Sequence, residues 1–387
     1  MIAKKMTAGF LRALQHLQYG SLQVTLPNGQ QHQFIGAQPG PSAVLHLHDH
    51  CVIRNLVWQG DIGFAEDYRR GYWDSPDIAN LIEFSLRNEQ ALQGYLYGNR
   101  WHQRLATLRY AFQRNSRQGS RKNIQAHYDL SNAFYALWLD PSMTYSSALY
   151  QHEDDHLTDA QNHKYDRILQ QLGDCPKRIL EIGCGWGGFA ARALQAGVDN
   201  LTGITLSSAQ YDYARQRLKH TAADMQLIDY RDLQGRYDSI VSIEMFEAVG
   251  KHYWRTYFDK IKHLLSRQGR AVIQTITISD DHFADYQNSG DAIRSYVFPG
   301  GMLPSPSRFR QVAEQAGLHF TNSHTFGQDY ARTLRCWRQR FDDQTAAIQA
   351  LSFDTAFIRL WRYYLSFCAG AFAAKRINVM QVTLAHA

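Results

Sequence analysis

The sequence is poor in cysteine and has no regular cysteine spacing. Its 387 residues include five cysteines and no CxxC pair. An odd number at irregular intervals indicates neither a disulfide framework nor a zinc ribbon, and it suits a reducing cytoplasm. The five are Cys51, Cys175, Cys184, Cys336 and Cys368.

Long apolar runs are also missing. The longest one near the end, "YYLSFCAGAFAA" at 363–374, is well short of the roughly 20 residues that cross a bilayer. At the start, Arg12, Gln15 and His16 interrupt any apolar core of a signal peptide. We therefore expect a cytoplasmic protein that meets membranes, if at all, from the inner surface.

The charge balance is modest. A net charge of +6 allows attraction to anionic lipid or to nucleic acid, and it demands neither. The basic stretch "AFQRNSRQGSRKN" at 111–123 has no interleaved aromatic residues typical of nucleic-acid binding, so it favours a solvated linker and no nucleic-acid partner. With 44% hydrophobic residues, the chain is long enough for two domains.

The first part of the chain predicts a small α+β domain at 1–115. Strand-like runs occur at 21–26, 43–48 and 51–58, separated by turn signals, and helical text follows at 76–113. His46, His48 and His50 alternate on one predicted strand face, but nothing around them indicates catalysis, so no metal site is predicted.

The second part, 116–387, alternates strands with helices, which predicts crossover units and a mostly parallel sheet of the α/β class. The irregular, aromatic- and glycine-rich segment 280–306 favours an inserted lid. Strands are expected at 178–182, 201–205, 225–229, 237–243 and 269–278, and helices at 187–196, 207–219 and 253–265.

A glycine-rich turn, "EIGCGWGG", follows the first strand of this part and opens a helix. Such a turn lets a ligand approach the backbone at the carboxyl ends of parallel strands. Dinucleotide sites usually place an acid about 20 residues further on, where this chain has Thr205, and this counts against NAD.

The chain resembles the cyclopropane-fatty-acyl-phospholipid synthase family of S-adenosylmethionine-dependent enzymes, which includes the mycolic acid cyclopropane synthases. The resemblance spans 123–384 through blocks such as "HYDLSNAFYALWLDPSMTYSSALY", "LEIGCGWGG", "GITLSSAQ" and "DSIVSIEMFEAVG". It implies a Rossmann-like class I methyltransferase domain. The first 110 residues resemble the lipid-facing, often dimer-forming domain of longer members, which implies a possible homodimer.

The resemblance also implies a set of residues that bind S-adenosylmethionine. They come from the "TYS" segment, the glycine loop, the second strand and the turn after the third strand. They are Tyr145, Ser146, Glu181, Gly183, Cys184, Gly185, Gly187, Thr205, Gln210 and Tyr230.

For the catalytic site the resemblance implies a bicarbonate bound by a cysteine, a glutamate, a histidine and a tyrosine. Glu247 and Tyr330 match, whereas Ser147 and Gln274 replace the cysteine and the histidine. Serine and glutamine still donate hydrogen bonds but cannot carry a proton onward, so bicarbonate binding stays doubtful.

Glu244 adds a carboxylate three residues before Glu247, on the same side if a helical turn forms there. One hypothesis makes it the base in place of bicarbonate; the other gives it a hydrogen bond to the cofactor or to a helix terminus. Cys368 matches a cysteine near the family's active site and is a further candidate.

The resemblance implies transfer of a methylene carbon to the double bond of phospholipid acyl chains, giving cyclopropane fatty acids. Because the anion site is altered, a methyl-branched or methylene product is the leading alternative. Methylation of a small molecule is less favoured. A non-enzymatic lipid-binding or nucleic-acid-binding module is the remaining reading, and the intact glycine loop argues against it.

Overall fold

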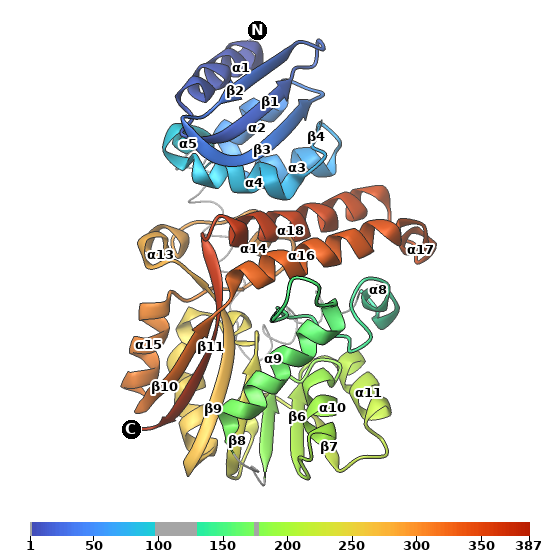
Figure 1. The fold of residues 1–387 in the computed structure, drawn as a ribbon, viewed down its shortest axis with the longest axis vertical. Coiled ribbons are helices and arrows are strands. Elements are labelled where there is room, and N and C mark those ends of the chain that lie inside the picture. Colours follow the sequence, from blue (N-terminus) through green and yellow to red (C-terminus); the bar gives the residue numbers. More distant parts are fainter. Residues whose placement is uncertain (1, 97–129, 174–177) are drawn as a thin grey trace. The chain divides into compact units, whose positions relative to one another are not determined.

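The computed structural model describes residues 2–96, 130–173 and 178–387 (Figure 1). The predicted linker and domain boundary at 111–123 lie outside these residues. Two compact units are present. The first unit comprises 1–112, 285–299 and 334–376, and the second comprises 113–284, 300–333 and 377–387.

A four-stranded sheet forms the centre of the first unit. Its order is β2 (Gln31–Ile35), β1 (Tyr19–Thr25), β3 (Gln38–Leu47) and β4 (Trp73–Asp74). β1 and β3 are parallel and the other pairs are antiparallel. The strands predicted at 21–26 and 43–48 are confirmed as β1 and β3, and their alternating burial marks one face turned to the core.

The strand predicted at 51–58 is wrong, because this segment is the helix α2 (Cys51–Gln59). Asp49 accepts a hydrogen bond from the backbone N–H of Cys51, 2.7 Å away, at the start of the helix. Val52, Ile53 and Leu56 are buried, and this spacing belongs to one face of a helix. A short apolar run alone does not separate the two structures.

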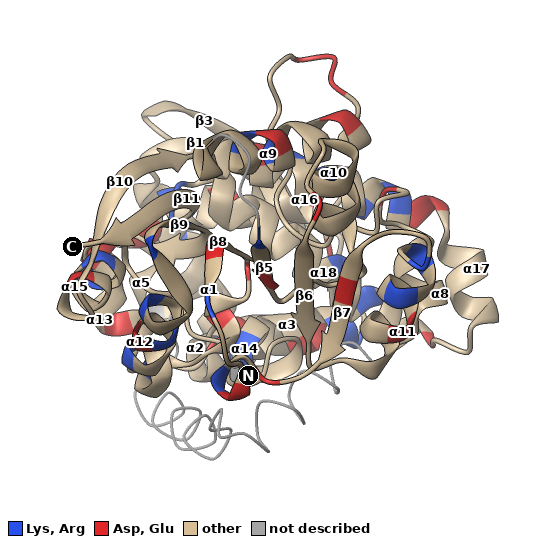
Figure 2. Ribbon diagram, turned by 90° about the horizontal axis from the view of Figure 1, so that it is seen from below, with Lys and Arg blue, Asp and Glu red and all other residues tan. Residues whose placement is uncertain are grey.

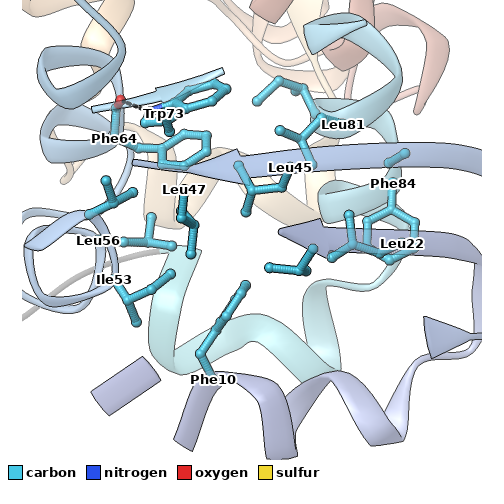
Figure 3. Close-up of a cluster of buried hydrophobic side chains, with 14 of the residues drawn as sticks. Phe10, Leu22, Leu45, Leu47, Ile53, Leu56, Phe64, Trp73, Leu81 and Phe84 are labelled. Atoms are coloured by element: carbon cyan, nitrogen blue, oxygen red, sulfur yellow. Dashed lines mark hydrogen bonds between the residues drawn. The ribbon is translucent and has the colours of Figure 1, made fainter. Parts of the chain in front are cut away.

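The other helices of this part are α1 (Ile2–Ala13), α3 (Asp61–Arg69), α4 (Ile78–Arg87) and α5 (Glu89–Leu96). α4 and α5 fall within the helical text expected at 76–113. Figure 3 shows the core that these helices share with the sheet, where Trp73 stacks on Phe64 with ring centroids 4.0 Å apart. The indole N–H of Trp73 donates to the Phe64 carbonyl oxygen at 2.8 Å.

We expect Phe84→Ala to destabilise the first unit by about 3–5 kcal/mol, because Phe84 is completely buried in this core and its loss leaves a cavity. Urea unfolding followed by tryptophan fluorescence measures the change. Ile35→Ala is the control, since Ile35 is 76% exposed, and it should shift the free energy of unfolding by less than about 0.5 kcal/mol. Equal losses in both variants would contradict the packing argument.

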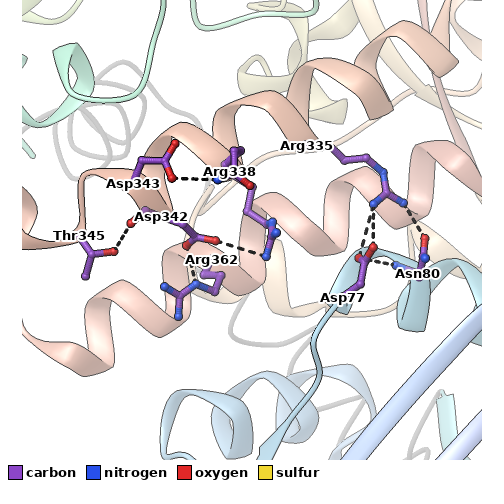
Figure 4. Close-up of polar contacts among 9 residues, drawn as sticks. Asp77, Asn80, Arg335, Arg338, Asp342, Asp343, Thr345 and Arg362 are labelled. Atoms are coloured by element: carbon purple, nitrogen blue, oxygen red, sulfur yellow. Dashed lines mark hydrogen bonds and ion pairs between the residues drawn. The ribbon is translucent and has the colours of Figure 1, made fainter.

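Segments from late in the chain complete the first unit. They are α14 (Ala292–Tyr296), residues 334–343 of α16 (Gly327–Asp343), α17 (Thr345–Ala350) and α18 (Thr355–Ala373). Arg335 donates to Asn80 at 2.9 Å and pairs with Asp77 at 3.2 Å (Figure 4). Arg359 on α18 donates to the backbone of Tyr68 and to Asp74.

Each compact unit is therefore assembled from separate stretches of the chain. The continuous division at 115/116 that the sequence suggested stays a prediction. Gly370 of α18 lies so close to the α4 backbone that an added Cβ would meet the Ala79 oxygen at 2.5 Å. Such contacts join residues nearly 300 positions apart, and no local sequence pattern predicts them. Among the described residues, no helix has both the length and the hydropathy to span a bilayer.

A seven-stranded sheet forms the second unit. Its order is β10 (Leu318–Thr325), β11 (Ile377–His386), β9 (Leu265–Ile278), β8 (Tyr237–Ile243), β5 (Ile179–Ile182), β6 (Leu201–Thr205) and β7 (Ala223–Leu227). The five strands from β9 to β7 are parallel, and β10 and β11 are antiparallel additions at one edge. This confirms the mostly parallel α/β sheet and all five of its predicted strands.

Helices α9 (Leu157–Leu172), α10 (Gly188–Gln195) and α11 (Ser208–Arg217) share a buried core with the central strands. α12 (Trp254–Leu264) and α15 (Pro306–Gln315) pack together, and Phe258 meets Phe309 with ring centroids 5.0 Å apart. The three predicted helices correspond to α10, α11 and α12. Figure 2 shows lysine and arginine interspersed with acidic residues on helices such as α11 and α12.

The segment expected to be an irregular lid contains two short helices, α13 (Asp280–Tyr286) and α14. Asp291 caps α14 by accepting the backbone N–H of Arg294 at 2.8 Å, and Asp61 accepts the N–H of Ala292 at 2.9 Å. The segment is therefore more regular than predicted. Its role as a lid stays a prediction.

Candidate active site

A pocket opens in the second unit where the parallel strands β5, β6 and β8 end. The carboxyl ends of such strands meet at one edge of a sheet, which is the usual ligand position in open α/β folds. The loops after these strands line the pocket together with residues 143–146. Nine of the ten residues expected to bind the cofactor line it: Tyr145, Ser146, Glu181, Gly183, Cys184, Gly185, Thr205, Gln210 and Tyr230.

The glycine loop is shaped by positive φ angles. Gly183 has φ +83°, and an added Cβ would meet the Met245 side chain at 3.0 Å. Gly185 has φ +51° and lines the pocket, and a Cβ there would meet nothing within 4 Å. Gly187, the tenth expected residue, does not line the pocket; it precedes α10 at φ +79° and faces Leu218 and Ala214.

Two aromatic and two polar residues form further walls. The ring of Tyr145 lies 5.5 Å from Tyr135 between centroids. Tyr230 is buried, and burial raises the pKa of its hydroxyl to about 12. Thr205 donates to the Gln210 amide oxygen at 2.8 Å and accepts the Ser207 N–H at 3.1 Å, which fixes both side chains at the pocket.

Glu181 on β5 brings a buried carboxyl into the pocket wall. It is 2% exposed, and its Oε2 has no hydrogen-bond partner within the described residues. Burial raises the pKa of Glu181 well above its usual value, and the charge of Lys164 opposes this. The pocket thus offers a polar atom that a ligand can satisfy.

Glu244 follows β8 with φ +50°, and its N–H donates to the Gln274 carbonyl oxygen at 2.8 Å. Its Oε1 accepts the Ser147 N–H at 2.9 Å and the Gln274 amide at 2.7 Å, and its Oε2 accepts the Tyr330 hydroxyl at 2.7 Å. The Gln381 amide donates to Gln274 Oε1 at 2.9 Å, which orients that side chain. Three donors therefore hold one carboxylate at the pocket.

Glu247 lies in the 3₁₀ turn η3 (Phe246–Ala248). Its Oε1 accepts hydrogen bonds from the Ile276 N–H and from the Thr275 hydroxyl, whereas its buried Oε2 has no partner within the described residues. Burial, with the nearby charge of Glu244, raises the pKa of Glu247 to about 8. Burial also raises the pKa of Glu244, but its three hydrogen bonds and Lys164 counteract this.

The structure thus brings together five of the six candidate catalytic residues: Glu244, Glu247, Tyr330, Ser147 and Gln274. Ser147 contributes its backbone N–H, since its hydroxyl donates to the Ala148 carbonyl oxygen at 2.9 Å. Cys368 lies on α18 of the first unit, where burial raises the pKa of its thiol. A catalytic role for Cys368 stays a prediction.

Sequence reasoning missed several residues of the site. Trp186 lines the pocket, and its indole N–H donates to Asn132 at 2.7 Å. Asp229 and Arg231 form an ion pair at the pocket edge. Lys164 on α9 is completely buried beside the pocket residue Ser146. Trp186 stands inside the glycine motif and could have been found there. Lys164 also had a signal, because its spacing places it on the same face of α9 as Ala160 and Ile168.

Comparison with known proteins identifies the family. The family model described as mycolic acid cyclopropane synthetase matches residues 115–382. The chain is 34% identical to the tuberculostearic acid methyltransferase of Mycobacterium tuberculosis, over 89% of this chain and 83% of that protein. It is 35% identical to the cyclopropane-fatty-acyl-phospholipid synthase of Escherichia coli, over 85% of this chain and 84% of that protein.

Solved structures agree. The mycolic acid cyclopropane synthase CmaA1, in complex with SAH and CTAB, superposes with a TM-score of 0.64 at 31% identity, covering 68% of this chain and 97% of that one. The glycine turn, the unpartnered Glu181 oxygen and the fixed Thr205 side chain fit S-adenosylmethionine as the ligand of the pocket. The chain belongs to the mycolic acid cyclopropane synthetase family and is an S-adenosylmethionine-dependent methyltransferase of the cyclopropane synthase type.

Proposed function

We propose that this enzyme transfers the methyl carbon of S-adenosylmethionine to the double bond of an unsaturated phospholipid acyl chain and closes a cyclopropane ring. The observation that carries the proposal is the Glu244 carboxylate, held at the pocket by Ser147, Gln274 and Tyr330. The relatives named for cyclopropane synthesis support the same reaction.

Binding and orientation come first. The cofactor supplies an electrophilic methyl group, and an alkene needs no deprotonation before it attacks. The protein must therefore align the two and keep water away from the positive charge that develops on the acyl chain. Tyr145, Tyr165 and Trp186 line the pocket, and aromatic faces both exclude water and tolerate a cation.

Ring closure then requires the loss of one proton from the transferred carbon. We assign this step to Glu244, the carboxylate that accepts three hydrogen bonds. The donors that an anion would need at this place already serve Glu244, so the proposal includes no bicarbonate. Glu247 has a pKa of about 8 and is therefore mostly neutral at pH 7, which suits a supporting acid better than a base.

A phospholipid substrate would require the enzyme to reach a membrane surface. We propose that it works at the inner membrane surface, with the N-terminal part of the first unit facing lipid or joining two copies in a homodimer. The support is that the E. coli relative, named for a phospholipid product, matches 85% of this chain, which is more than the family model covers.

A methyl-branched or methylene chain is the second candidate product. The relative named tuberculostearic acid methyltransferase matches 89% of this chain, so a closely related protein is named for a different fatty acid.

Deuterium labelling separates these outcomes. Purified protein, vesicles of monounsaturated phospholipid and cofactor with a fully deuterated methyl are incubated, and the released fatty acids are analysed by mass spectrometry. A ring keeps two deuterium atoms and resists mild hydrogenation. A methylene group also keeps two but takes up hydrogen. A methyl-branched chain keeps three when the cation instead loses a proton from a neighbouring chain carbon, which leaves a double bond in the chain. Lipid without label would overturn the proposed function.

A further inference from the structure

Lys164 is a completely buried lysine to which the proposed reaction assigns no role. It lies on α9, and its Nζ donates to Ser146 Oγ and to Gln161 Oε1, both at 2.7 Å. The Gln161 amide in turn donates to the Ser146 carbonyl oxygen at 2.9 Å. Lys164 and Gln161, both on α9, therefore each donate a hydrogen bond to the pocket residue Ser146.

Carboxyl groups from three other elements act on this ammonium. They are Glu244 after β8, Glu181 on β5 and Asp140 before the "TYS" segment. Burial lowers the pKa of Lys164 to about 7, and the three acids oppose that shift. Around Glu244 the other titratable groups are Tyr330 on α16 and Glu247 in η3.

A buried ammonium persists only where charges of opposite sign compensate its lost hydration. The same compensation works in the other direction, since Lys164 lowers the pKa of both Glu181 and Glu244 against the effect of burial. Geometry joins the two groups as well. Lys164 Nζ donates to Ser146 at 2.7 Å, and the N–H of the next residue, Ser147, donates to Glu244 at 2.9 Å.

We propose that Lys164 is a positioning residue. Its hydrogen bonds hold the Ser146–Ser147 segment between the cofactor pocket and Glu244, and its buried ammonium provides a positive charge beside that carboxylate. The inference rests on the proposed function, because it presumes that Glu244 removes the proton. Lys164 itself contacts no reacting atom.

The charge has a defined consequence for the pH dependence. Glu244 acts only when ionised, so kcat falls as the pH drops through its pKa. Without the ammonium that pKa rises further, and the acidic limb of the profile moves to higher pH. Above a pH of about 7, Lys164 of the unaltered enzyme loses its own proton, and the two enzymes should converge.

The test compares Lys164→Met with the unaltered enzyme in the vesicle assay, at several pH values from about 6 to about 9. On the acidic limb, below the pKa of Glu244, we expect kcat to fall by up to about tenfold, the effect of a shift of one pKa unit, and at pH 9 to lie within about twofold. Lys260→Met is the matched control, since Lys260 on α12 donates to a backbone oxygen instead, and its profile should not move.

A loss of kcat that is equal at every pH would overturn the inference, because it would indicate a packing defect alone. Should Lys164→Met fail to fold, Lys164→Gln keeps a hydrogen-bond donor without the charge and must show the same shift. If Lys164→Met still labels lipid and its pH profile of kcat does not shift, only this inference is overturned. If the unaltered enzyme gives no labelled lipid, the proposed function is overturned instead.

Discussion

Glu244→Gln should lower kcat about 1,000-fold and leave the affinity for S-adenosylhomocysteine nearly unchanged. The carboxylate accepts hydrogen bonds from Ser147, Gln274 and Tyr330, and an amide would turn an N–H₂ group toward one of these donors. It would also lack the basicity to take the proton, and loss of a general base costs about 10²–10⁴ in rate. The vesicle assay gives kcat, and isothermal titration calorimetry gives the affinity.

Glu247→Gln is the matched control for that variant. Because the pKa of Glu247 is about 8, the side chain is mostly a neutral acid at pH 7, and glutamine imitates it. We expect kcat to fall by less than about tenfold. A larger loss for Glu247→Gln than for Glu244→Gln would make Glu247 the base. Weakened cofactor binding with normal turnover in Glu244→Gln would support the hypothesis that Glu244 only contacts the cofactor.

The arrangement of the two acids shows what the sequence could predict. Their closeness was expected from a helical turn between Glu244 and Glu247. Instead, Glu244 adopts φ +50° before a 3₁₀ turn, and the two side chains reach neighbouring positions of β9, Gln274 and Thr275. The expected proximity is present, but tertiary contact with β9 creates it.

The parallel sheet of the second unit could be predicted because each strand carries its own apolar run and each helix its own periodicity. The membership of α18 in the first unit could not, since it depends on contacts with α4 far back in the chain. Lys164 could not be assigned for a related reason. It lies on the buried face of α9 with Ala160 and Ile168, but only the folded chain places its ammonium among carboxyl groups.

Gly185→Val should abolish binding of S-adenosylhomocysteine, weakening it by more than about 100-fold in calorimetry. Two effects add. Gly185 has φ +51°, where a β-branched residue is strained, and its missing Cβ leaves open space on the pocket side of the loop. A valine side chain would occupy the space in which the cofactor meets the backbone.

Gly197→Val separates these two effects. Gly197 has φ +92°, also with nothing within 4 Å of an added Cβ, but it lies exposed after α10 and does not line the pocket. Its variant should lose about 1–2 kcal/mol of stability through backbone strain and still bind the cofactor product with normal affinity. If both variants lose binding, strain alone explains the loss at Gly185. Unchanged affinity in Gly185→Val would mean that the cofactor does not lie against this loop.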